Sequence, residues 1–244
     1  MTLLQINNVS MQFAGSGKPS LQHVSYQVAS GDFVILLGSN GSGKSSLLKL
    51  LHREYISHTG SIELMGKPVT HYSEAEFRRH VAVLNQDCEE ALFPSLTLYE
   101  NYLLMSHRQS LFTRHRSERA FLMEALQEFN PNLSHKLDLP VSQLSGGEKQ
   151  TLALAFCLLQ PPKILLLDEH TSALDPKTSA QIMRLTQAMI TQHHMTCILT
   201  THDLDIAMQY GNRILMLNEG RIQHMFDEQE KCRLTKEDLI RHYY

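Results

Sequence analysis

Residues 33–51 read FVILLGSNGSGKSSLLKLL, an apolar run, a loop of Gly, Ser and Asn, and then leucines at helical spacing. This order predicts a buried strand, a tight loop and a helix. Glycines let such a loop wrap around an anion, so that its N–H groups and the positive end of the helix face the same point. We therefore expect the loop to bind phosphate groups.

The spacing of Gly38, Gly43, Lys44 and Ser45 matches the pattern GxxxxGK[ST] in the strand-loop-helix context that it requires. In that pattern the lysine reaches the β- and γ-phosphates of a nucleotide, and the hydroxyl binds Mg²⁺. The residues expected to contact the nucleotide here are Gly38, Ser39, Asn40, Gly41, Ser42, Gly43, Lys44, Ser45 and Ser46.

A second apolar run, KILLLDEH at residues 163–170, predicts a strand that ends in Asp168 and is followed at once by Glu169. Successive side chains of a strand alternate in direction, so these two carboxylates can serve different tasks. We expect Asp168 to hold the metal and Glu169 to orient or deprotonate an attacking water. An acidic pair that merely closes a strand is the alternative, and the phosphate loop upstream disfavours it.

Between these segments, residues 144–148 read LSGGE and directly precede a helical stretch. A Ser-Gly-Gly turn at a helix N-terminus presents free N–H groups and a positive dipole end, which predicts a second anion site. Two anion sites in one chain suggest two nucleotides shared between two copies. Taken alone, the turn could equally be a helix cap.

The rest of the chain alternates strands and helices. Strands are predicted at LLQINNV and HVSYQV, a hairpin at residues 59–69, and further strands at VAVLNQ, TCILTT and RILMLN, while residues 88–141 have helical periodicity. This pattern predicts an α/β fold with a mainly parallel, doubly covered sheet. We expect one domain over residues 1–244, with a helical subdomain inserted at about 88–141.

Composition excludes several classes of protein. The chain has 244 residues, of which 22 are Lys or Arg and 25 are Asp or Glu, so it lacks the basic character of a nucleic-acid-binding protein. No apolar run approaches the 18 or so residues of a membrane span, and the start lacks a signal peptide pattern. The four cysteines show no CxxC spacing, which favours a reducing compartment. Any role at a membrane is expected to be peripheral.

Over essentially its whole length, the chain resembles the nucleotide-binding subunit of an ATP-binding cassette (ABC) transporter. The resemblance implies a P-loop ABC ATPase fold, in which an antiparallel β subdomain at the N-terminus joins the parallel sheet and the inserted helices. It makes 38–45 the Walker A loop, Gln86 the Q-loop glutamine, 144–148 the signature, 164–168 the Walker B strand and 172–175 the D-loop.

The resemblance also implies roles for single residues. The catalytic residues are Glu169, His202 and Gln86, and the metal is Mg²⁺ held by Ser45, Gln86 and Asp168. ATP contacts are expected at Phe13, whose ring would stack on adenine, and at Ser145, Gly146, Gly147 and Asp175. Tyr26 is the alternative aromatic. Glu148, Thr151 and His170 depart from the common family pattern.

The segment DEHTSALDPKT at residues 168–178 is similar to the corresponding segment in an importer branch of the family, which transports small organic solutes such as amino acids. It implies an ATPase on the inner face of the cell membrane that works with a second copy of itself, a permease and a solute-binding protein, and not with nucleic acid. An ABC exporter, a soluble cassette acting on DNA or ribosomes, and an inactive dimerisation partner are the alternatives. Glu169, His202 and the intact Ser145 turn argue against the inactive partner.

Overall fold

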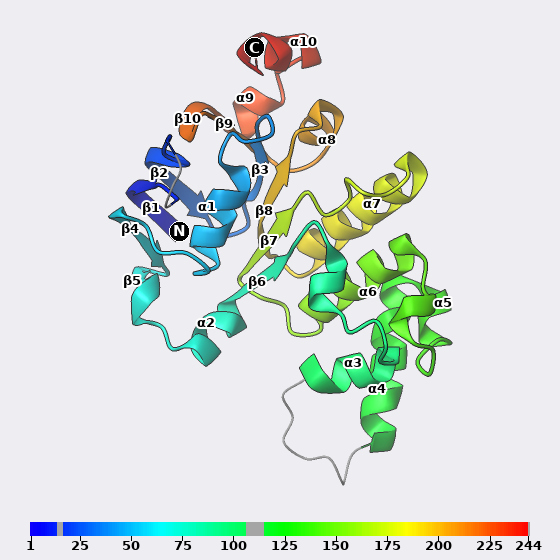
Figure 1. Cartoon of the computed structure of the whole chain (residues 1–244). Helices are drawn as coiled ribbons and strands as arrows, with labels where there is room; N and C mark the ends of the chain where they lie inside the picture. The colour runs from blue at the N-terminus through cyan, green and yellow to red at the C-terminus, as the bar shows by residue number, and fades with distance from the viewer. Residues whose placement is uncertain (14–16, 106–114, 244) are drawn as a thin grey trace. The chain divides into compact units, whose positions relative to one another are not determined.

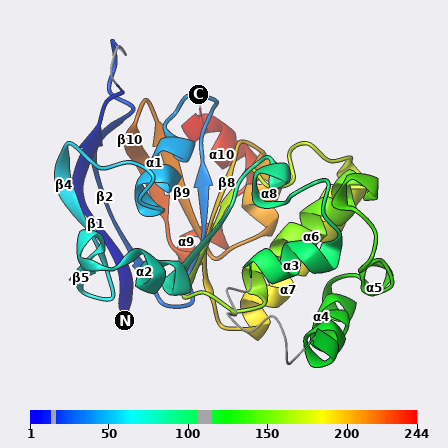
Figure 2. The same ribbon diagram turned by 60° about the horizontal axis from the view of Figure 1, so that its bottom comes forward.

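The computed structural model describes residues 1–13, 17–105 and 115–243. It divides into two compact units, drawn in Figures 1 and 2. The first combines residues 1–83, 162–169 and 189–244, and the second combines 84–161 and 170–188. The second unit is therefore assembled from a wider part of the chain than the helical segment expected at 88–141.

The N-terminal sheet has the strand order β2-β1-β4-β5. Its strands are β1 (Thr2–Met11), β2 (Leu21–Ala29), β4 (Thr59–Leu64) and β5 (Lys67–Pro68). β1 pairs antiparallel with β2 and β4, and β4 with β5. Leu4 and Ile6 of β1 are buried while Gln5 between them is half-buried, which is the alternation of a half-buried strand. The expected antiparallel β subdomain and hairpin are confirmed.

The larger sheet has the order β10-β9-β3-β8-β7-β6. Its strands are β3 (Phe33–Leu37), β6 (Val81–Leu84), β7 (Ile164–Asp168), β8 (Thr196–Thr201), β9 (Arg213–Asn218) and β10 (Arg221–Phe226). β3 pairs parallel with both β8 and β9, and β7 pairs parallel with β8, whereas β10 is antiparallel to β9. Every residue of β3 is buried. The mainly parallel sheet is confirmed.

The parallel pairing determines where the site forms. β3 lies between β9 and β8 and is the blue arrow of Figure 2. Because neighbouring parallel strands end at the same edge, the segments that follow β3, β7 and β8 meet there. These segments begin at Gly38, Glu169 and His202.

The first unit also contains short helices. These are α1 (Lys44–Leu51), the 3₁₀ turn η1 (Val69–His71), α2 (Glu74–His80), α8 (Leu204–Gln209), α9 (Glu228–Lys231) and α10 (Lys236–Tyr243). α1 buries Leu47, Leu48, Leu50 and Leu51 in the core that includes β3. This packing fixes the helix that follows the phosphate loop.

The second unit is built mainly from helices. They are η2 (Cys88–Ala91), α3 (Leu98–Met105), α4 (His115–Phe129), α5 (Pro131–Ser134), η3 (Val141–Gln143), α6 (Gly146–Leu158) and most of α7 (Pro176–Gln192). α6 is buried on nearly all sides, as a helix that is apolar around its circumference must be. Within the described ranges, no helix has the length and apolar character needed to span a membrane.

Candidate functional site

The loop between β3 and α1 depends on a glycine at its last position. Gly43 is the N-cap of α1 and has a φ of 107°, in the left-handed region. A Cβ on Gly43 would lie 2.5 Å from the carbonyl oxygen of Ser20. Any larger residue would therefore be strained in its backbone and would collide with that carbonyl.

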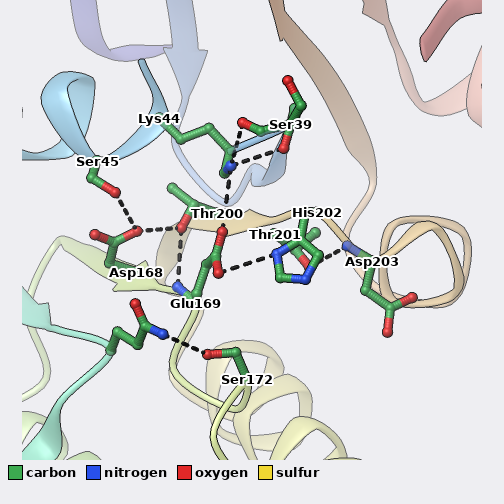
Figure 3. Close-up of polar contacts among 12 residues, drawn as sticks. Ser39, Lys44, Ser45, Asp168, Glu169, Ser172, Thr200, Thr201, His202 and Asp203 are labelled. Atoms are coloured by element: carbon green, nitrogen blue, oxygen red, sulfur yellow. Dashed lines mark hydrogen bonds and ion pairs between the residues drawn. The ribbon is translucent and has the colours of Figure 1, made fainter. Parts of the chain in front are cut away.

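Lys44 holds a positive charge at this loop, although its side chain is only 5% exposed. Its Nζ donates to the carbonyl oxygens of Gly38 at 2.8 Å and Ser39 at 3.1 Å, and it lies 3.3 Å from Oε1 of Glu169 (Figure 3). A buried ammonium group requires such partners. The charge needed for phosphate binding is thus already in place inside the loop.

The remaining loop residues differ in exposure. Ser39, Asn40 and Gly41 are exposed, and Ser46 is half-buried on α1. The Oγ atom of Ser42 is buried without a hydrogen-bond partner among the described residues.

Asp168, the last residue of β7, meets two hydroxyl groups. Ser45 Oγ donates to its Oδ1 at 3.2 Å, and Thr200 Oγ1 donates to the same atom at 2.6 Å. Hydroxyl and carboxylate oxygens are the ligands that Mg²⁺ prefers. Two of the three residues expected to hold the metal therefore lie together, and their chemistry fits that ion.

Glu169 has a φ of 42°, a left-handed conformation that is uncommon for a residue other than glycine. Its N–H donates to Thr200 Oγ1 at 3.0 Å, while Oε2 accepts from Nδ1 of His202 at 3.1 Å (Figure 3). A carboxylate can only accept, so Nδ1 carries the proton. The carboxylate of Glu169 is thus held between the Lys44 ammonium and the His202 ring, away from the oxygen atoms of Asp168.

Thr200 was not predicted from the sequence, yet it joins the two carboxylate residues. Its hydroxyl accepts from the N–H of Glu169 and donates to Asp168. The one signal in the sequence was a threonine in the buried strand TCILTT, where an apolar residue would be the ordinary choice.

Gln86, in the second unit, is exposed just after β6. Its Nε2 donates to Ser172 Oγ at 3.1 Å, which ties the expected Q-loop glutamine to the first residue of the expected D-loop.

The second glycine turn begins α6. Ser145 is the N-cap: its Oγ accepts the N–H of Glu148 at 3.3 Å, and Oε2 of Glu148 accepts the N–H of Ser145 at 3.1 Å. Gly146 and Gly147 form the first turn, where N–H groups have no acceptor within the helix. A Cβ on Gly147 would lie 2.5 Å from Cγ2 of Thr178, so a larger residue there would require the Thr178 side chain to move.

A pocket of about 670 Å³ lies beside this turn, within the second unit. Ser145, Gly146, Gly147 and Asp175, all expected to contact the nucleotide, line it together. Oδ1 of Asp175 accepts from the N–H groups of Lys177 and Thr178, each at 3.1 Å. Hydrogen bonds from Thr178 hold the pKa of Asp175 below its usual value.

The two candidate aromatic residues differ in exposure. Phe13, two residues after the end of β1, is 36% exposed and packs edge-on against Tyr55, with ring centroids 5.2 Å apart. Tyr26 is half-buried and packs against the core, and burial raises the pKa of its hydroxyl. Phe13 has more free ring surface for a stacked base.

Each of the three departures from the family pattern has a local contact, although Nδ1 of His170 is buried without a hydrogen-bond partner among the described residues. His170 is buried, which lowers its pKa to about 3 and keeps the ring neutral, and its Nε2 lies 3.3 Å from Thr186 Oγ1. Thr151 Oγ1 donates to the carbonyl oxygen of Gly147 at 2.8 Å. Glu148 forms an ion pair with Lys136.

Comparison with known proteins gives one family. The model of the ABC transporter family matches residues 21–172. A tyrosine transport ATP-binding protein of Clostridioides difficile is 35% identical over 98% of this chain and 97% of the relative. A phosphonates import ATP-binding protein, PhnC of Trichormus variabilis, is 33% identical over 90% of this chain and 91% of the relative.

Solved structures agree with the sequence relatives. CbiO1 from Clostridium perfringens, part of the ABC transporter complex CbiONQ, superposes with a TM-score of 0.82 at 27% identity, over 98% of this chain and 93% of CbiO1. The ATP-binding cassette MJ0796, as a dimer in a post-hydrolysis state bound to ADP and Pi, gives a TM-score of 0.77 at 26% identity over 93% and 99%.

Proposed function

This chain belongs to the ABC transporter family, and we propose that it is the ATP-hydrolysing subunit of an importer for small organic solutes of the amino-acid type. The observation that carries the hydrolytic part is the convergence of Lys44, Asp168, Glu169 and His202 at one edge of the sheet. The import of such a solute rests on the tyrosine and phosphonate relatives, which cover nearly the whole chain.

The phosphate loop binds the triphosphate of ATP. Lys44, whose Nζ donates to two loop carbonyls in this structure, neutralises the β- and γ-phosphates, and loop N–H groups donate hydrogen bonds to the remaining phosphate oxygens. Ser45 and Asp168, together with Gln86, would hold Mg²⁺, and this ion would offset charge on the phosphate oxygens. Phe13 stacks on the adenine ring.

Glu169 is the general base of hydrolysis. It takes a proton from the attacking water while the water oxygen bonds to the γ-phosphorus and ADP leaves. Nδ1–H of His202 donates a hydrogen bond to the Glu169 carboxylate, and this bond fixes the orientation of the carboxylate. The His202 side chain is 49% exposed, so its ring is open to contact with the transferred phosphate.

The second glycine turn completes the site in a dimer. Ser145, Gly146 and Gly147 present N–H groups to the γ-phosphate of ATP held by a second copy, and Asp175 lies in the same pocket. Two copies would then enclose two ATP molecules. The dimeric cassette among the structural relatives supports this arrangement.

The dimer would move a permease that receives its solute from a binding protein, with the chain attached peripherally to the inner face of the membrane. The structural relative that forms part of a transporter complex supports a membrane partner. The low basic content gives no support to nucleic acid as a partner.

Solute uptake by cells tests the proposal. We expect a strain without this gene to lose uptake of a labelled amino acid such as tyrosine, and to regain it with the wild-type gene but not with Lys44→Ala. A panel with phosphonate and methionine identifies the solute class. Unchanged uptake of all three, or accumulation caused by lost efflux, would reject an importer of this type.

A further inference from the structure

The pocket beside the Ser145 turn has an unfavourable charge for a site that receives phosphate. Among the described residues that line it are two carboxylates, Glu148 and Asp175, and neither lysine nor arginine. A triphosphate approaching two uncompensated carboxylates would be repelled, most strongly where water is partly excluded. The pocket therefore requires compensation for both charges.

Asp175 is compensated by the helix that it caps. Its Oδ1 accepts the N–H groups of Lys177 and Thr178 in the first turn of α7, each at 3.1 Å. The positive end of a helix dipole stabilises a carboxylate in this position. The carboxylate is thus turned toward its own helix.

Glu148 is compensated by a side chain from another segment. The Nζ atom of Lys136, which follows α5, lies 2.5 Å from Oε1 of Glu148. The other oxygen, Oε2, accepts the N–H of Ser145 at 3.1 Å and its hydroxyl at 3.3 Å. One carboxylate thus joins the Lys136 ammonium to the N-cap of α6.

The environment strengthens this pair. The Glu148 side chain is 17% exposed and that of Lys136 is 31% exposed, so salt screens the pair less than an open surface pair. Burial alone would raise the pKa of Glu148, but the bonds from Lys136 and Ser145 outweigh it and hold the pKa below its ordinary value. Glu148 is therefore ionised and depends on its partner.

We propose that Lys136 is a positioning residue for the second phosphate-binding turn: it cancels the charge of Glu148 and fixes the carboxylate in the capping geometry. Gly146 and Gly147 can then present their N–H groups to the γ-phosphate of ATP bound by another copy. The inference rests on the shared-site function proposed above. Lys136 and Glu148 then act as a pair: with a neutral glutamine at position 148 there is no carboxylate charge to cancel, so the lysine is no longer needed.

A double-mutant cycle tests the pair in the full chain carrying Glu169→Gln, which keeps ATP intact. Dimerisation with Mg²⁺ and ATP is measured by analytical ultracentrifugation for the parent, Lys136→Met, Glu148→Gln and the combination of both. We expect Lys136→Met to weaken dimerisation by about three- to tenfold. The combination should return to within about twofold of Glu148→Gln.

Two further measurements separate charge from general damage. Arg119→Met is the matched control, because it breaks the Arg119–Asp138 ion pair of the same unit and neither residue lines the pocket. It should leave dimerisation unchanged. The Lys136→Met defect should also shrink as NaCl is raised from about 50 to about 500 mM, as a charge effect must.

The outcomes distinguish this inference from the function beneath it. If the Glu169→Gln parent forms no dimer with ATP, the shared site fails and the role of Lys136 fails with it. Suppose that the parent dimerises and that Lys136→Met dimerises equally well, or that adding Glu148→Gln to Lys136→Met does not restore dimerisation. Lys136 is then not a positioning residue, although the shared nucleotide site is still supported. Circular dichroism of the Lys136→Met monomer checks that the variant is folded, which every one of these conclusions requires.

Discussion

The two glycine turns of this chain each lead into a helix but obtain their positive charge differently. In the first, Lys44 is the opening residue of α1, is almost fully buried and bonds to carbonyls of its own loop. In the second, the described pocket lining offers no cation, and Lys136 reaches Glu148 from a separate segment. The first turn is thus equipped to bind a free polyanion. The second is only neutralised, which suits a turn that meets a nucleotide already bound elsewhere.

The strongest test of this contrast concerns the carboxylates next to each turn. Glu169→Gln keeps the size of the side chain but removes the base, so ATP hydrolysis should fall by about 10² or more while ATP affinity persists. Released phosphate is measured at saturating Mg²⁺ and ATP. The same exchange at the second turn, Glu148→Gln, should leave the rate within a few-fold. Hydrolysis at the wild-type rate by Glu169→Gln would show that the base is another group.

The next largest effect concerns the two lysines. Lys44→Ala should weaken ATP binding to the monomer by at least about a hundredfold, since it removes the charge that meets the β- and γ-phosphates. Calorimetry with ATP measures this. Lys136→Met should leave monomer affinity unchanged, because its turn serves the other copy. Equal losses in both variants would abolish the distinction between the turns.

A smaller effect is expected for the aromatic residue that stacks on the adenine ring. Phe13→Ala should cost about 1 to 3 kcal/mol of ATP binding, the usual contribution of one stacked base. Because the phosphates do not touch this ring, binding of inorganic triphosphate should be unaffected. Tyr26→Ala is the comparison variant, and an effect there with none at Phe13 would transfer the adenine contact to Tyr26.

The smallest effect concerns stability and pH. The pKa of Glu148 is lowered in the folded chain, so its bonds stabilise the fold above the unfolded value near 4.3 and are lost as the pH falls through the lower, folded value. Thermal unfolding should show wild type more stable than Glu148→Gln at pH 7, with the gap closing below about pH 4. A difference in stability between wild type and Glu148→Gln that grows on acidification would contradict a stabilising ion pair at Glu148.

The parts of the site that sequence predicted are those encoded by short segments. Gly38 to Ser45 and Ser145 to Gly147 are recognisable because a loop and the helix after it are both local. Asp168 and Glu169 follow from an apolar strand that ends in two acids. Sheet order brings these segments together; the alternation of strands and helices predicted a mainly parallel sheet but not the order of its strands.

The residues that were missed act across the fold. Thr200 bonds to Asp168 and Glu169 only because β8 pairs with β7, and no local pattern encodes that contact. Lys136 is one of many lysines until α6 places Glu148 beside it. The breadth of the second unit has the same origin, because segments 84–161 and 170–188 join through tertiary contacts.

The central position of β3 has a consequence for synthesis of the chain. Both neighbours of this strand come late: β8 begins at Thr196 and β9 at Arg213, whereas β3 begins at Phe33. Contacts so distant in sequence form slowly, and during translation they cannot form until most of the chain has emerged. A nascent chain therefore carries its phosphate loop on an unpaired strand. Since a ligand that binds only the folded state stabilises it, ATP assists the completed polypeptide and not its fragments.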